Sequence, residues 1–162
     1  MVIKQQKMTK ILDEMLSQEI ATSIKSKPKK CFDNAYRAAL AIEGTIYVQG
    51  FLVIPAISEQ PLEYGWLELG DRIVDPTFVH LGVTAENLYY FPAQSLTIKK
   101  LTAILEESKE DYPLDDPLPV YGDVPYEYYG DLMLGGTDYQ TAYMLALDKC
   151  QELQIFQAQE TN

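Results

Sequence analysis

A predicted β-hairpin over residues 62–77 constrains the fold of this 162-residue chain more than any other feature. Two runs rich in β-branched and aromatic residues, LEYGWLEL and RIVDPTF, are separated only by Gly70 and Asp71, which favour a two-residue turn. If that turn sets the register, Trp66 lies opposite Asp75. Tyr64 and Asp75 are then diagonal neighbours on one face, about 7 Å apart, so we expect their side chains to touch.

The first half of the chain predicts two helices and a further strand. Apolar residues at three- and four-residue steps predict an amphipathic helix from Met8 to Ile24. Pro28 ends that helix, and a second one is expected to begin at about Cys31, with alanines that allow close packing against a sheet. The run TIYVQGFLVIPA predicts a strand that ends near Pro55.

The second half predicts two more helices around an irregular segment. The run SLTIKKLTAILEES fits a helix capped by Ser95. Residues 111–131 hold four prolines and five tyrosines, and this aromatic content favours an irregular but ordered excursion. Residues 137–157 predict a final helix. Its expected apolar stripe comprises Tyr139, Ala142, Tyr143, Leu145, Ala146, Cys150, Leu153 and Phe156.

Together these elements predict an α+β fold in one domain spanning residues 1–162, with N-terminal helices packed on a small antiparallel sheet. Cys150 is expected to be a small core residue on its helix stripe.

The charge distribution argues against nucleic acid as a direct ligand. The net charge is −11, and residues 1–30 carry +4, so residues 31–162 carry −15. The densest acidic stretch, residues 106–131, holds nine carboxylates and one lysine. A solvated face accounts for this stretch, and the alternative is a surface for a basic partner or for nucleic-acid mimicry.

The cysteine and histidine content predicts no metal or cofactor. Two cysteines in separate helices and a single histidine give neither a disulfide framework nor a zinc motif. No apolar run approaches the roughly 18 residues needed to span a bilayer. Acidic residues also interrupt the N-terminal segment, so it has no apolar core of a signal peptide. We therefore expect a cytoplasmic protein without membrane association.

Cys31 is the candidate nucleophile. Its predicted place at a helix N-terminus, directly after Lys29 and Lys30, favours a thiolate, and we expect its pKa to fall below the usual value of about 8.5. The alternative is a small residue at a packed helix start.

The residues around Cys31 and the predicted hairpin resemble the pattern of a known family. A helix-opening Cys followed by an Asn, a Tyr-Val-x-Gly strand, a Pro-x-Glu-His-Ala-Trp strand and a Val-x-Asp-Pro-Thr strand are typical of small papain-like-fold, transglutaminase-like proteins of phages and bacteria. The chain resembles this pattern over residues 27–80. The matching positions are Cys31, Asn34, Tyr47, Val48, Gln49, Gly50, Glu63, Trp66, Val74, Asp75, Pro76 and Thr77.

The resemblance implies a papain-like fold and a triad of Cys nucleophile, His base and Asp orienter for amide or ester cleavage or acyl transfer. Cys31 matches the nucleophile and Asp75 the orienter, but the histidine position is occupied by Tyr64 and the following alanine by Gly65. A neutral phenol cannot take a proton from a thiol near pH 7, and a neighbouring Asp75 would raise its pKa further. We therefore expect the Tyr64 hydroxyl to donate a hydrogen bond to Asp75.

Three further residues are candidates for supporting roles. His80 is the only other candidate base, and the alternative is a structural histidine. Asn34, one helical turn after Cys31, is expected either to orient the site or to bond to nearby backbone. Trp66 is expected to pack over the site side of the hairpin or to be an ordinary core aromatic.

A candidate recognition loop comprises Tyr121, Tyr126, Tyr128 and Tyr129, and its alternative is a cover for the edge of the core. The leading hypothesis from the sequence is a degenerate cysteine hydrolase that binds a peptide or protein partner. Two alternatives remain. One is an active cysteine-dependent amidohydrolase, peptidase or acyltransferase with a non-standard base, and the other is an acidic inhibitor or mimic.

Overall fold

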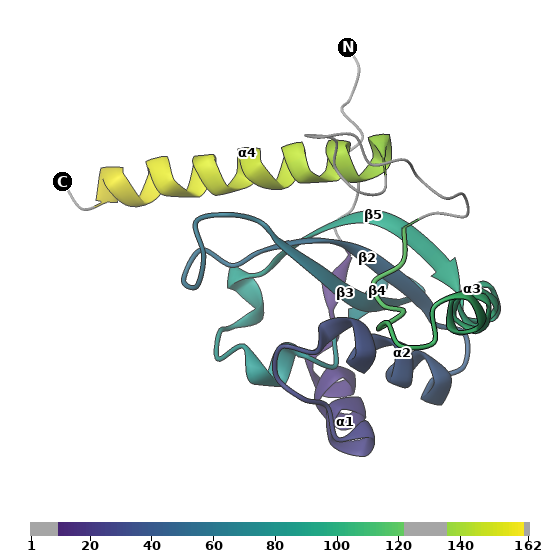
Figure 1. Ribbon diagram of the computed structural model, residues 1–162. Helices are drawn as coiled ribbons and strands as arrows, with labels where there is room; N and C mark the ends of the chain where they lie inside the picture. Colours follow the sequence, from purple (N-terminus) through teal and green to yellow (C-terminus); the bar gives the residue numbers. More distant parts are fainter. Residues whose placement is uncertain (1–9, 122–135, 161–162) are drawn as a thin grey trace, which may run out of the picture.

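A five-stranded sheet organises the protein (Figure 1). The computed structural model describes residues 10–121 and 136–160. The elements are β1 (Ile11–Leu12), α1 (Glu14–Ile24), α2 (Cys31–Ala41), β2 (Ile46–Val53), β3 (Leu62–Leu69), β4 (Arg72–Val74), the 3-10 turns η1 (Phe78–His80) and η2 (Ala85–Asn87), β5 (Tyr89–Thr97), α3 (Ile98–Asp111) and α4 (Thr137–Glu160). The architecture is mixed helix and sheet, as predicted.

The hairpin register follows the two-residue turn. Strand order is β1-β4-β3-β2-β5, and β3 pairs antiparallel with β4 through Leu67–Val74, Glu68–Ile73 and Leu69–Arg72. Gly70 has a positive φ of 62°, which glycine adopts without steric cost. The predicted hairpin is confirmed, and it fixes which residues of β3 share a face with Asp75.

The N-terminal prediction is wrong at its start. Ile11 and Leu12 form the edge strand β1, which runs parallel to β4, so the sheet is mixed and not purely antiparallel. The helix begins only after Asp13, whose side chain accepts a hydrogen bond from the backbone N–H of Leu16 as an N-cap. An N-cap residue lies just before the first turn of its helix. The predicted helix is therefore divided at Asp13 into strand β1 before it and helix α1 after it. Met8 lies outside the described residues.

Strand β5 is absent from the prediction. Ser95, expected to cap a helix, lies within β5, and Thr97 caps α3 by accepting from the N–H of Lys100. β5 pairs antiparallel with β2 and is irregular beside Gly50. A Cβ at Gly50 would lie 2.1 Å from the Phe91 carbonyl oxygen, so glycine is required for this close approach.

Helices pack against different strands of the sheet. In Figure 1, α4 runs along β5 and β2, whereas α1 and α2 lie below β3 and β4. Gly65 lets α2 approach β3, because a Cβ there would lie 2.8 Å from a ring carbon of Phe32. On α4, Cys150 is buried as predicted, but Leu145 is 55% exposed, so the predicted stripe is wrong at that position. No helix in the described ranges has both the length and the apolar composition of a membrane span.

Candidate functional site

Cys31, Tyr64 and Asp75 come together in the interior. Cys31 begins α2, Tyr64 lies in β3, and Asp75 follows β4. Cys31 and Tyr64 belong to one buried cluster, and the Tyr64 hydroxyl donates to Asp75 at 2.9 Å from Oδ2 and 3.2 Å from Oδ1. The Asp75 charge also acts on the thiol of Cys31. The predicted Tyr64–Asp75 hydrogen bond is confirmed.

Asp75 is completely buried and accepts hydrogen bonds from several elements. Besides Tyr64, the Tyr90 hydroxyl donates to Oδ2 at 2.8 Å and the Thr77 N–H donates to Oδ1 at 2.9 Å. The backbone N–H of Asp75 donates to Ser17 Oγ of α1 at 2.9 Å. The residue therefore connects α1, β3 and β5. Tyr90 was missed from the sequence because its strand was missed.

Burial raises the pKa of the Asp75 carboxyl to about 6, and the hydrogen bonds from Tyr90, Thr77 and Tyr64 limit that rise. The carboxyl therefore binds its proton more tightly when folded than when unfolded. The resulting stability is fully present below the unfolded pKa of about 3.9 and is lost as pH rises through about 6.

We predict that wild-type protein loses about 2 kcal/mol of unfolding free energy from this group between pH 4 and pH 6, which is most of the roughly 3 kcal/mol that a shift of two pKa units represents over the whole titration. Urea denaturation across this range measures the loss, and Asp75→Asn is the control because an amide does not titrate. Parallel pH profiles for the two proteins would contradict the prediction.

The prediction for the Cys31 thiol was wrong in direction. Burial, with a smaller contribution from the charge of Asp75, raises its pKa to about 12, although a backbone hydrogen bond with Gly65 works in the opposite direction. The residue Cys31 is only 9% exposed, whereas Lys29 and Lys30 are exposed. Removal of the sulfur from water therefore outweighs the neighbouring cations and the helix terminus.

The Tyr64 phenol is neutral and fixed. Burial and the charge of Asp75 raise its pKa well above the usual value, and burial does the same for Tyr90. Both hydroxyls donate to the same carboxylate. Neither phenol can act as a base toward Cys31 near neutral pH.

Trp66 completes an aromatic cluster beside these groups. It is fully buried, its ring meets Tyr90 edge-on at 5.1 Å, and it lies 6.4 Å from the ring of Tyr64. Among the described residues, no hydrogen-bond partner is present for its indole Nε1. Trp66 thus lies on the site side of the hairpin and is also a core aromatic, so both expectations hold.

Asn34 is a buried anchor for the loop that precedes Cys31. Its Nδ2 donates to the Lys27 carbonyl at 2.7 Å and to Thr77 Oγ1 at 2.9 Å, and its Oδ1 accepts from the Lys27 N–H at 3.0 Å. His80 is exposed, and its Nε2 lies 3.0 Å from both Oγ and O of Ser26. The imidazole thus contacts the same loop, and the structure places it outside the buried Tyr64–Asp75 pair.

Gln49 is the centre of a second buried hydrogen-bond network. No sign of this network is present in the sequence, because Gln49 lies within an otherwise apolar strand run. Gln49 Oε1 accepts from the Val120 N–H at 2.9 Å, and Nε2 donates to the Val120 carbonyl at 2.6 Å and to Tyr139 Oη at 2.7 Å. Tyr121 donates to Glu63 and packs on the ring of Tyr139 at 5.3 Å. The remaining residues of the predicted recognition loop, Tyr126, Tyr128 and Tyr129, lie outside the described residues.

The described part of the chain contains no group of three His, Cys, Asp or Glu side chains able to hold a metal ion. Comparisons with protein-family models, with curated proteins and with solved structures found no significant match.

Proposed function

We propose that this protein is a catalytically inactive member of the papain-like, transglutaminase-like cysteine hydrolases and acts in the cytoplasm by binding a peptide or protein partner. The observation that carries the proposal is the Tyr64 phenol. It donates to Asp75 in the place of a catalytic imidazole, beside a thiol whose pKa is about 12. Without a base beside the thiol, the protein keeps the arrangement of the site residues but cannot carry out the reaction of the family.

The raised pKa of the Cys31 thiol weighs against catalysis. Burial raises this pKa to about 12, so the thiol stays protonated at pH 7, whereas cysteine hydrolases depend on a substantial thiolate fraction. The fixed phenols of Tyr64 and Tyr90 offer no route to raise that fraction. This makes the active-enzyme alternative less favourable than binding.

The role of Asp75 also supports the proposal. In a triad the carboxylate orients a histidine. Here it accepts from two phenols and from backbone N–H groups, so its hydrogen-bonding capacity serves the fold. The residues that match the hydrolase pattern thus form a structural centre of the fold.

We expect no Cys31-dependent turnover of activated esters and slow alkylation of Cys31 by iodoacetamide at neutral pH, because its thiol is buried and protonated. Mass spectrometry of the intact folded protein measures alkylation, and an unfolded sample gives the rate of an accessible thiol. Cys31→Ala is compared with Cys150→Ala as the matched control. Turnover abolished by Cys31→Ala and retained in Cys150→Ala would contradict catalytic inactivity.

A further inference from the structure

The loop between α1 and α2, residues 25–30, is held rigidly from within and is here called the lysine loop. Buried Asn34 bonds to both backbone groups of Lys27, and Arg37 donates to the carbonyl of Ile24 and to Asn34 Oδ1. His80 contacts Ser26 through its Nε2. Three side chains, two from α2 and one from η1, thus hold the backbone of the lysine loop in place.

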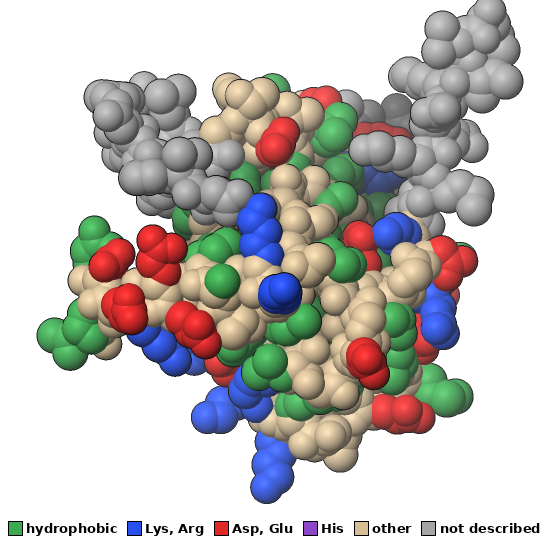
Figure 2. All heavy atoms as spheres, turned by 90° about the vertical axis from the view of Figure 1, so that its right-hand side faces the viewer, with side chains coloured by type: hydrophobic (Ala, Val, Ile, Leu, Met, Phe, Trp, Pro, Cys, Tyr) green, Lys and Arg blue, Asp and Glu red, His purple; other side chains and the backbone are tan. Residues whose placement is uncertain are grey.

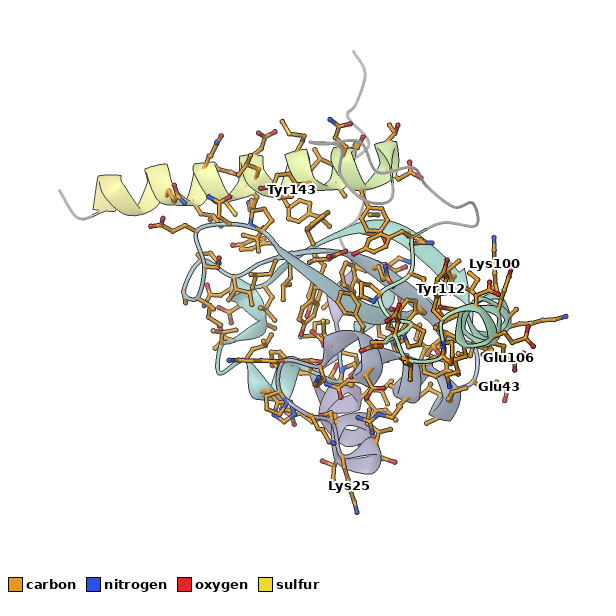
Figure 3. All side chains as sticks on the ribbon, in the orientation of Figure 1. Lys25, Glu43, Lys100, Glu106, Tyr112 and Tyr143 are labelled. Atoms are coloured by element: carbon orange, nitrogen blue, oxygen red, sulfur yellow. The ribbon has the colours of Figure 1, made fainter. Side chains whose placement is uncertain are left out.

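The lysine side chains of the loop are exposed to solvent. The four lysines Lys25, Lys27, Lys29 and Lys30 are exposed, and none forms an ion pair within the described residues. The loop contains no acidic residue, in a chain whose net charge is −11. Figure 2 shows Lys and Arg side chains projecting from the lower end of the molecule, where Figure 3 labels Lys25.

The backbone of the loop is unusual for lysine. Lys25 and Lys29 have φ values of 55° and 62°, in the left-handed region where glycine and asparagine are the favoured residues. Either replacement would suit the backbone better than lysine, so backbone conformation does not explain the charge at Lys29. At Lys25 the C-terminus of α1 also favours a cation. Lys29 and Lys30 also directly precede Cys31, at the start of α2.

We propose that the lysine loop is the docking surface for an acidic segment of the polypeptide partner. This rests on the proposed binding function and gives the partner a chemistry. Because the hydrogen bonds of Asn34 already order the loop, binding loses little backbone entropy, and four exposed cations are available to carboxylates.

A peptide suits this surface better than nucleic acid. Residues 31–162 carry −15, so an extended polyanion would meet repulsion beyond the loop. A short acidic segment stays within the field of the lysines, because charges further away than about 8 Å are largely screened at physiological salt.

The test is a fluorescence-anisotropy titration of the full chain with a labelled oligoglutamate peptide. The variant Lys25→Asn/Lys29→Gly removes two charges with residues that tolerate a positive φ, so its fold should be kept. The matched control, Lys99→Gln/Lys109→Gln, removes two exposed lysines from α3. Thermal unfolding checks that both variants are folded.

We expect the loop variant to bind about tenfold more weakly than wild type, because it loses two of the four lysine charges of the loop, and the α3 control to bind like wild type. Added salt should weaken wild-type binding. Absence of binding, an equal loss in both variants, or tighter binding of a single-stranded oligonucleotide of equal charge would overturn the proposal. Each of these outcomes is independent of Cys31-dependent turnover, which tests the proposed inactivity.

Discussion

Replacing Asp75 by alanine should cost about 4 kcal/mol of unfolding free energy, the largest stability effect expected from a substitution at the candidate site. The change leaves the hydroxyls of Tyr64 and Tyr90 and the N–H of Thr77 buried without their common acceptor. An unsatisfied buried donor costs about 1–3 kcal/mol, and several are created at once. Urea denaturation at pH 7, monitored by the fluorescence of buried Trp66, measures the effect.

Asp75→Asn is the matched control, because the amide keeps the size of the carboxylate and one oxygen acceptor. It also removes a buried charge, so we expect it to retain most of the stability that alanine loses. A loss below about 1 kcal/mol for Asp75→Ala would show that water replaces the carboxylate and that Asp75 does not hold α1, β3 and β5 together.

Tyr64→His should give the protein a Cys31-dependent esterase activity. An imidazole at this position would lie beside Asp75, which can orient it, and near Cys31, from which it can take a proton. The resulting imidazolium would stabilise the thiolate and so offset the rise in the Cys31 pKa that burial causes. General-base assistance contributes about 10²–10⁴-fold, so turnover of an activated ester should rise by that order above the wild-type background. Steady-state ester hydrolysis measures the gain.

The gain must disappear in Tyr64→His/Cys31→Ala, because an accessible histidine hydrolyses activated esters without a thiol. Tyr64→Phe is the second control, since it removes the phenol without supplying a base. A folded Tyr64→His protein with no Cys31-dependent gain would mean that the missing histidine is not what prevents catalysis, and burial of Cys31 would then be the cause.

The part of the fold that could be predicted depends on local signals. The Gly70-Asp71 turn fixed the register of β3 and β4, and with it the Tyr64–Asp75 contact. β1 could not be found this way, because two residues carry no periodicity and its parallel pairing with β4 joins distant parts of the chain. β5 was hidden because Ser95 and Thr97 are both reasonable helix caps, and only the pairing with β2 places Ser95 in a strand.

The residues that form the site were easier to predict than their pKa values and hydrogen bonds. Cys31 was placed correctly, but the lysines before it suggested an activated thiol, whereas burial determines its pKa. Burial depends on packing from β3 and the turn after β4, which no local pattern around Cys31 contains. Tyr90 likewise reaches Asp75 only because β5 folds onto the sheet. The sequence near a residue shows which side chain is present, but its electrostatic environment depends on segments that are distant in the sequence.

The side chain of Gln49 substitutes for a peptide group of a strand. Its amide exchanges two hydrogen bonds with the backbone of Val120, as one residue does with its partner in an antiparallel ladder. The same amide also donates to Tyr139 of α4. The chain after α3 and the last helix are therefore both hydrogen-bonded to the same side chain of β2, so Gln49 joins two segments that the sequence places far from this strand.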